Sequence, residues 1–178
     1  IALAQLNPVV GDIAGNRRRA SEVLRRARDA EAELAVFGEL SLCGYPPRDL
    51  VRKEQFVADS QAAAESLAEE CRDIAALVGF VRPTPGEEGR PLQNVAALLA
   101  DGQVGHVHAK TLLPTYDVFD ETRYFQPGDR PACFEVAGRR VGLSICEDLW
   151  DSVALGRALY GEDPIDLLVR DGAEVILN

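Results

Sequence analysis

The feature that most constrains this chain is its alternation of short apolar runs, which have the length of strands, with longer amphipathic segments, which have the length of helices. The runs that predict strands are Ile1–Leu6, Ala32–Leu40, Leu77–Val81, Val95–Leu99, Val104–Ala109, Cys133–Val136, Val141–Cys146 and Glu174–Leu177. The segments that predict helices are Asn16–Ala30, with Asn16 as the expected N-cap, Lys53–Ile74 and Asp163–Asp171.

Two short turns add hairpins to this alternation. Asp101-Gly102 and Ala137-Gly138 each join two apolar runs, and a glycine at this place is typical of tight β-turns. Helices between strands together with two hairpins predict a mixed sheet covered by helices. The 178 residues suffice for one domain with a sizeable core, so we expect a single α/β domain.

Composition and charge narrow the possible partners. The formal net charge is −10, which argues against a partner bound through nucleic-acid phosphates. No apolar run approaches the roughly 18 residues that cross a bilayer, and the start lacks the pattern of a signal peptide, so we expect no membrane association. The four cysteines lack C-x-x-C spacing, which predicts neither a zinc site nor a disulfide framework and favours a reducing cytoplasm.

Three reactive residues stand at the ends of three predicted strands. Glu39, Lys110 and Cys146 each follow an apolar run, and ligands bind at the carboxyl ends of strands in open α/β sheets. Taken singly, each has an ordinary interpretation: a solvated acid, a surface lysine and a small core residue. The coincidence of three such residues at three strand ends favours a shared site.

The three residue types have a coherent chemistry. A cysteine thiolate is a nucleophile, a neighbouring lysine favours the thiolate, and a neighbouring carboxylate can take the thiol proton. Cleavage of an amide places negative charge on the carbonyl oxygen, which Lys110 and the backbone N–H after Cys146 could stabilise. A single carboxyl, Glu39, could then serve as base and acid in turn.

The histidines offer a competing interpretation. His106 and His108 alternate on the face that Lys110 shares, so one of them could pair with Cys146 as a base. They could also form a metal pair, but no third ligand is evident, and we predict no metal site. The carboxylate–lysine–cysteine arrangement is preferred.

Three longer strings carry a family resemblance: Glu39–Leu50 (ELSLCGYPPRDL), Lys110–Phe125 (KTLLPTYDVFDETRYF) and Cys146–Trp150 (CEDLW). The chain resembles the carbon–nitrogen hydrolase (nitrilase) superfamily over its whole length, and these strings resemble the glutaminase domain of NAD⁺ synthetases. The resemblance implies an α-β-β-α sandwich and a Glu39–Lys110–Cys146 triad. It also implies that Glu121 is a second catalytic glutamate beside the lysine and that Tyr116 lies near the substrate.

The same resemblance implies that L-glutamine is hydrolysed and that its ammonia amidates deamido-NAD⁺ in a C-terminal synthetase domain. That domain would use ATP and Mg²⁺, whereas this one would need no cofactor. We expect residues 1–178 to be a truncated glutaminase domain whose sandwich is incomplete at the C-terminal end, with the segment that binds the glutamine α-groups lying beyond Asn178. A homo-oligomer in the cytoplasm is expected.

Two alternatives stay open. The first is a stand-alone amidase or carbamoylase of the same superfamily. The second belongs to another class, a catalytically inactive interaction module with the nitrilase fold, although the three triad residues are all present. The strings also contain Glu147 and Trp150, to which the sequence assigns no role.

Overall fold

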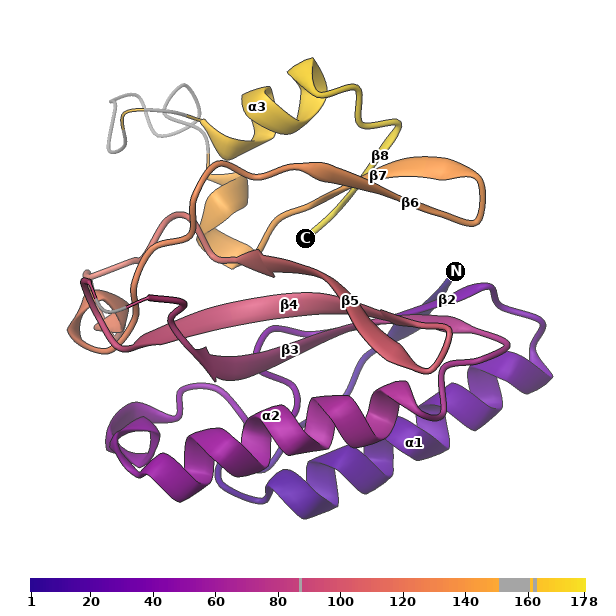
Figure 1. Ribbon diagram of the computed structural model, residues 1–178, viewed down its shortest axis with the longest axis horizontal. Helices are drawn as coiled ribbons and strands as arrows, with labels where there is room; N and C mark the ends of the chain where they lie inside the picture. The colour runs from indigo at the N-terminus through magenta and orange to yellow at the C-terminus, as the bar shows by residue number, and fades with distance from the viewer. Residues whose placement is uncertain (87, 151–160, 162) are drawn as a thin grey trace.

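The computed structural model describes residues 1–86, 88–150, 161 and 163–178. Its elements form the layers α-β-β-α: two helices, a first sheet, a second sheet and a third helix (Figure 1). The helices are α1 (Ile13–Asp29), α2 (Glu54–Ala68) and α3 (Pro164–Arg170), with 3₁₀ turns η1 (Arg48–Arg52), η2 (Glu121–Arg123) and η3 (Cys146–Leu149). The strands are β1 (Ala2–Ala4), β2 (Leu34–Phe37), β3 (Ala75–Pro83), β4 (Leu92–Ala100), β5 (Gln103–Ala109), β6 (Cys133–Val136), β7 (Arg139–Leu143) and β8 (Val175–Leu177).

The first sheet has the order β1-β2-β3-β4-β5. Strands β1, β2 and β3 are parallel, and β3, β4 and β5 are antiparallel to one another in turn. The second sheet has the order β6-β7-β8, with an antiparallel hairpin followed by a parallel pair. The four-layer sandwich implied by the family resemblance is therefore confirmed. The first sheet is mixed and covered by helices, as strand alternation predicted, but that alternation did not indicate that β6, β7 and β8 form a second sheet.

Both predicted hairpins are confirmed. The β4–β5 turn passes through Asp101 and Gly102 at φ values of 53° and 77°, and the β6–β7 turn passes through Ala137 and Gly138 at 50° and 67°. Positive φ at both central residues gives the twist that matches paired strands. The turns therefore follow directly from local sequence.

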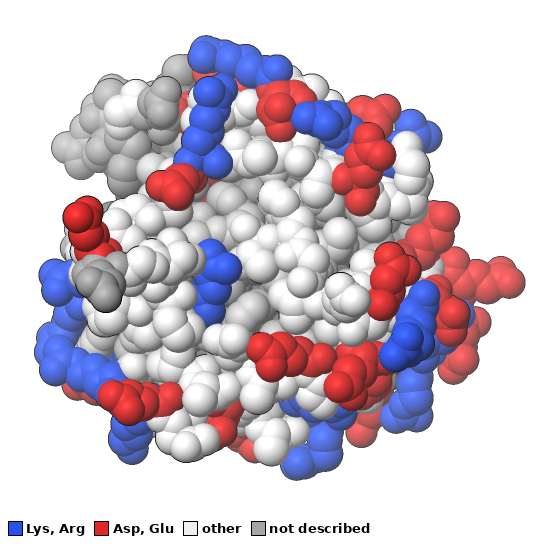
Figure 2. All heavy atoms as spheres, in the orientation of Figure 1, with Lys and Arg blue, Asp and Glu red and all other residues white. Residues whose placement is uncertain are grey.

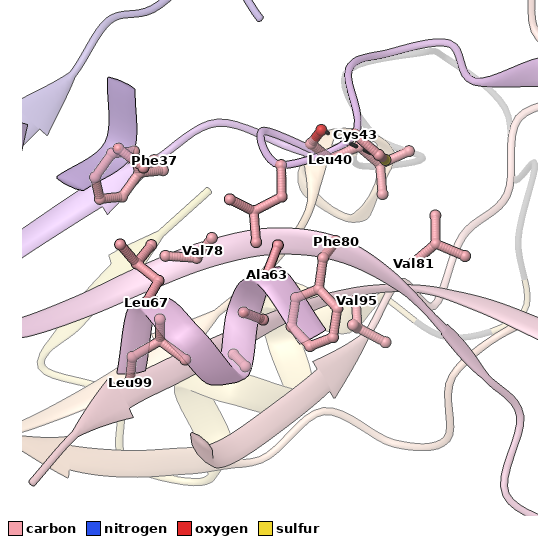
Figure 3. Close-up of a cluster of buried hydrophobic side chains, with 14 of the residues drawn as sticks. Phe37, Leu40, Cys43, Ala63, Leu67, Val78, Phe80, Val81, Val95 and Leu99 are labelled. Atoms are coloured by element: carbon pink, nitrogen blue, oxygen red, sulfur yellow. Dashed lines mark hydrogen bonds between the residues drawn. The ribbon is translucent and has the colours of Figure 1, made fainter. Parts of the chain in front are cut away.

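The main core lies between the first sheet and the helices α1 and α2. Apolar side chains of both helices, such as Leu24 and Leu67, are fully buried in one cluster with side chains of the first sheet. Figure 3 shows the part of this cluster around Leu67, Val78 and Leu99. A smaller cluster joins the two sheets, including Leu77 from the first and Phe134 from the second. Apolar burial on this scale is the main stabilising contribution in such a domain.

The charged side chains on one face of the molecule are distributed unevenly. Figure 2 shows acidic and basic side chains mostly around the rim of one face, while the centre is largely uncharged and hollowed between the layers. Within the described part of the chain, no helix combines the length and hydropathy that a bilayer crossing requires.

Two helix ends differ from the sequence prediction. The N-cap of α1 is Asp12, whose carboxylate accepts from the Gly15 N–H at 2.9 Å, so Asn16 lies in the first turn instead. Helix α2 ends at Ala68 rather than at Ile74. Negative charge at a helix C-terminus opposes the helix dipole, and the acids Glu69 and Glu70 follow this end.

The strands that precede the reactive residues are also shorter than predicted. Strand β2 ends at Phe37, and Leu40 takes a φ of 46°. Strand β7 ends at Leu143, and Cys146 takes a φ of 47° at the start of η3. Because a positive φ cannot continue a strand, both Glu39 and Cys146 lie in tight turns beyond the strand ends.

Candidate active site

Lys110 is the centre of a buried polar cluster. Its backbone follows β5 and is held on both sides, because its N–H donates to the Asn94 carbonyl at 2.9 Å and its carbonyl accepts from the Gly128 N–H at 2.8 Å. The fully buried ammonium donates to Glu39 Oε1 at 2.8 Å and to Glu121 Oε1 at 2.9 Å. The structure thus brings together three of the residues predicted from sequence.

Glu39 reaches this cluster from the turn after β2. A Cβ at position 79 would lie 2.4 Å from the Leu40 nitrogen, so only a glycine in β3 lets this turn pack so closely. The Asn94 amide donates to Glu39 Oε1 at 2.6 Å, which fixes the carboxylate from β4. The Glu39 side chain remains 17% exposed and borders a pocket of about 360 Å³; among the described residues, this pocket is lined by neither Lys110 nor Cys146.

Glu121 opens the short turn η2 and is almost fully buried. Its Oε1 atom accepts from Lys110 and from the Tyr45 hydroxyl, the latter at 2.8 Å. Its Oε2 atom is buried without a hydrogen-bond partner among the described residues. The Oε1 atom of Glu121 is therefore held by two donors, whereas Oε2, within the described part of the chain, is free to accept a hydrogen bond from a further donor.

Cys146 lies half-buried at the start of η3. The left-handed backbone conformation of a non-glycine residue costs roughly 1–2 kcal/mol, and such strain persists only where the surroundings enforce it. Here the buried residues on either side, Ile145 and Glu147, anchor the turn. The strained turn thus places the half-buried Cys146 beyond the end of β7.

Burial and the neighbouring Glu39 carboxylate together keep the Cys146 thiol protonated. Burial raises the pKa of Cys146, and the negative charge of Glu39 raises it further, while Lys110 lowers it; the pKa rises to about 11. A hydrogen bond with Glu39 contributes in the same direction. The thiol can therefore become a thiolate only if a base takes its proton, and Glu39 is placed to do so.

Lys110 itself remains charged. Burial lowers the pKa of its ammonium, but the negative charges of Glu39 and Glu121 and their hydrogen bonds raise it above its ordinary value. Burial raises the pKa of Glu121, and Lys110 offsets this only in part. The cluster thus holds one firm cation between two carboxyl groups, and the pKa of one of them, Glu121, lies above its ordinary value.

Tyr116 lies beside this cluster, in the loop before η2. Its side chain is half-exposed, and its hydroxyl donates to Glu147 Oε2 at 2.7 Å. This hydrogen bond, with burial and the Glu147 charge, raises the pKa of Tyr116 to about 12. The ring meets Phe119 edge to face at 5.6 Å. Tyr116 therefore joins the loop to the residue after Cys146.

The histidines take other partners. His106 stacks on Phe134 of the second sheet, and His108 Nε2 lies 3.2 Å from Asp148 Oδ2. Among the described residues, neither histidine is hydrogen-bonded to Cys146, and the described part of the chain holds no cluster of possible metal ligands. The Cys–His alternative gains no support from these contacts.

Sequence reasoning missed three members of the site. Asn94, Tyr45 and Asp148 contact Glu39, Glu121 and the two turns respectively. The only signal for Asn94 was an amide directly before the apolar run Val95–Leu99, and the signal for the other two was their place in the strings Glu39–Leu50 and Cys146–Trp150. Apart from the bond between Asp148 and Ile145, the contacts named here join residues at least 36 positions apart, so no local pattern reveals them.

The four-layer fold, with a buried lysine between two glutamates and a cysteine beside them, defines the class of nitrilase-type hydrolases. The chain belongs to the carbon–nitrogen hydrolase family, which it matches over residues 1–178. It is 37% identical over 180 residues to a glutamine-dependent NAD⁺ synthetase of Thermotoga maritima and 40% identical over 183 residues to one of Synechocystis. Each match covers 100% of this chain, but 29% and 33% of the respective relative, so the chain spans about a third of their length.

Solved structures agree with this assignment. A glutamine-dependent NAD⁺ synthetase of Acinetobacter baumannii has a TM-score of 0.78 at 38% identity over 86% of this chain and 28% of that one. An amidase of Nesterenkonia has the same TM-score at 22% identity, over 98% of this chain and 61% of that one. The second likeness shows the fold alone, because its identity is low.

Proposed function

We propose that this domain hydrolyses L-glutamine to L-glutamate and ammonia through a thioester on Cys146. The observation that carries the proposal is the position of Lys110, a buried ammonium held within 2.9 Å of both Glu39 and Glu121 beside a cysteine. The similarity to glutamine-dependent NAD⁺ synthetases supports glutamine as the amide. Burying a cation between two acids next to a thiol is costly, and binding a partner at the surface does not require it.

The first half-reaction forms the thioester. Glu39 takes the Cys146 proton, and the sulfur attacks the side-chain amide carbon of glutamine. The resulting tetrahedral intermediate carries a negative oxygen, toward which Lys110 can direct the ammonium hydrogen that neither glutamate uses. Glu39 then gives its proton to the nitrogen, the C–N bond breaks, and ammonia leaves.

The second half-reaction consumes water. Glu39 takes a proton from the water as its oxygen attacks the thioester carbon, and the carbon–sulfur bond then breaks. The proton returns to the sulfur, which restores the thiol and releases glutamate. Glu121 supports both steps by holding Lys110, and we assign Tyr116 a place at the substrate because it borders the Cys146 turn through Glu147.

We further propose that the ammonia serves a C-terminal synthetase domain of the same protein, which amidates deamido-NAD⁺ with ATP and Mg²⁺. The support is the length of the relatives, of which this chain spans about a third. In this proposal residues 1–178 belong to the glutaminase domain, which needs no cofactor of its own, and the assembly is a cytoplasmic homo-oligomer.

The test uses Cys146→Ala in the intact protein, with Cys133→Ala as a matched control. We expect the Cys146 variant to lose glutamine-dependent ammonia release and NAD⁺ synthesis while keeping synthesis driven by added ammonia. The Cys133 variant should keep both. Equal loss of both activities in a folded Cys146 variant would refute the two-site proposal.

A panel of simple aliphatic amides and N-carbamoyl amino acids distinguishes the stand-alone amidase or carbamoylase. Under our proposal, glutamine gives the highest kcat/KM of the panel. A simple amide that is turned over more efficiently than glutamine would favour the amidase instead. Absence of turnover on the whole panel, in protein whose Cys146 remains reduced, would favour the inactive interaction module.

A further inference from the structure

Asp148 lies two residues after Cys146, fully buried, and no step of the proposed reaction uses it. We propose that Asp148 is a positioning residue that sets the place of the Lys110 turn relative to the Cys146 turn. The proposal rests on the proposed function only in taking Cys146 as the nucleophile. Its main evidence is a set of hydrogen bonds that one carboxylate makes to both turns.

The two carboxylate oxygens of Asp148 accept hydrogen bonds from different turns. Oδ1 accepts from the backbone N–H groups of Thr111 and Leu112, at 3.0 and 2.7 Å, directly after Lys110. Oδ2 accepts from the Ile145 N–H at 3.0 Å, directly before Cys146. Bonds from backbone N–H groups to a carboxylate are stronger than bonds between neutral groups.

These bonds join parts of the molecule that no strand pairing joins. Lys110 follows β5, which pairs with β4 in the first sheet, whereas Cys146 follows β7, which pairs with β6 and β8 in the second. Among the described strands, no ladder spans the two sheets. The distance between lysine and thiol therefore depends on contacts other than strand pairing. Asp148 supplies two hydrogen bonds between the turns, to Thr111 and Leu112, while its bond to Ile145 fixes the carboxylate within the Cys146 turn.

A role confined to η3 does not account for this arrangement. A local cap requires only the bond to Ile145, three residues away, whereas Thr111 and Leu112 lie 37 and 36 residues away. A buried carboxylate is costly unless it is hydrogen-bonded. Asp148 has no ion pair with a lysine or arginine among the described residues, and its remaining partner is His108 at 3.2 Å. The backbone bonds therefore offset its burial.

Asp148→Asn separates the two functions of this side chain. An amide has a single acceptor oxygen, so it can keep the bonds to Thr111 and Leu112 or the bond to Ile145, but it must turn its NH₂ group toward the other donors. Shape and volume are preserved. Asp59→Asn, an exposed aspartate on α2, is the matched control.

The experiment measures kcat and KM for glutamine and the pH dependence of Cys146 alkylation by iodoacetamide, followed by peptide mass spectrometry, in the intact protein. We expect Asp148→Asn to lower kcat about 10–100-fold, as small misplacements of catalytic groups do, with KM changed less than about threefold. The alkylation midpoint should shift from the wild-type value, because Glu39 raises and Lys110 lowers the pKa of Cys146, and the balance between them depends on the spacing of the turns. An unchanged kcat, or an unchanged midpoint in a folded variant, would overturn the proposal.

A second measurement needs no variant. In the wild-type protein, amide hydrogen exchange of Thr111, Leu112 and Ile145 should share one protection factor, because one carboxylate holds all three. Exchange of Ile145 that is independent of the other two would overturn the proposal even if Asp148→Asn failed to fold. Alkylation and hydrogen exchange can be measured whether or not glutamine is the substrate. A failure of the positioning role can therefore be distinguished from a failure of the proposed function.

Discussion

The helix-covered face of the first sheet and the turns that carry Lys110 and Cys146 are both buried, but they are filled by different side chains. The first region consists of aliphatic and aromatic groups such as Leu67 and Phe80. The second holds Lys110, Glu121 and Asp148, whose charges are compensated by one another or by backbone N–H groups. Apolar packing needs only the right volume, whereas charged groups need partners at particular positions.

The cysteines show the same contrast. Burial raises the pKa of Cys43 to about 12 and that of Cys71 to about 11, close to the value for Cys146. A raised pKa therefore does not by itself mark a nucleophile. What sets Cys146 apart is that a carboxylate and an ammonium stand beside it, while Cys43 lies in the apolar cluster of Figure 3.

The largest expected effect comes from Lys110→Met. Losing one oxyanion donor costs about 10²–10³ in rate, and Lys110 also neutralises the two carboxyl groups, so we expect glutaminase kcat/KM to fall by more than about 10³-fold. The fold should persist, because Glu121 can take a proton. Lys53→Met, at the other lysine of the chain, should stay near wild type. Activity of Lys110→Met within tenfold of wild type would remove Lys110 from the site.

Glu39→Gln should change activity and thiol reactivity in opposite directions. Loss of the base should lower kcat by about 10²–10⁴-fold. Because the Glu39 charge helps to raise the Cys146 pKa to about 11, its removal should lower that pKa. Alkylation of Cys146 at pH 8 should therefore be faster than in wild type, and Glu135→Gln should leave it unchanged. Slower alkylation would contradict the electrostatic account.

Tyr45→Phe should have a modest effect. It removes the hydroxyl that donates to Glu121 at 2.8 Å, and a hydrogen bond contributes about 0.5–1.5 kcal/mol, which corresponds to about a two- to tenfold loss in kcat/KM. Steady-state kinetics with glutamine measure the effect. A loss as large as that of Lys110→Met would mean that Tyr45 acts on the substrate directly.

The smallest effect on activity should follow a change in the apolar region. Leu67 is fully buried, so Leu67→Ala should destabilise the fold by about 2–5 kcal/mol while activity per folded molecule stays within twofold. Val169→Ala, at an exposed position of α3, should change neither. Denaturant unfolding measures the stability, and active-site titration with kinetics measures the activity per folded molecule. A loss of kcat per folded molecule in Leu67→Ala would contradict the separation of the apolar core from the site.

Much of the fold was predictable because it depends on local patterns. The hairpins at Asp101-Gly102 and Ala137-Gly138 were located from two residues each, and every predicted strand is present. The ends were less predictable: β7 was expected to run to Cys146 but ends at Leu143, since the apolar pattern does not reveal the left-handed turn. The division into two sheets depends on contacts between layers, and only the family resemblance indicated it.

The site was predictable where the family motifs marked it. Glu39, Lys110 and Glu121 are in contact as expected, and Cys146 lies beside them, although their catalytic roles stay predictions. Asn94 and Asp148 act across 55 and 36 or more residues of sequence, and nothing local distinguishes them from other polar residues in a core.

The most direct test of the central claim, that Cys146 is the nucleophile for glutamine, is covalent trapping with a glutamine-analogue electrophile. Intact-protein and peptide mass spectrometry would locate and count the label. We expect one label per chain, on Cys146, with protection by glutamine and strong slowing in Lys110→Met. A label on Cys43, Cys71 or Cys133 instead, or labelling of Cys146 that glutamine does not slow, would contradict it.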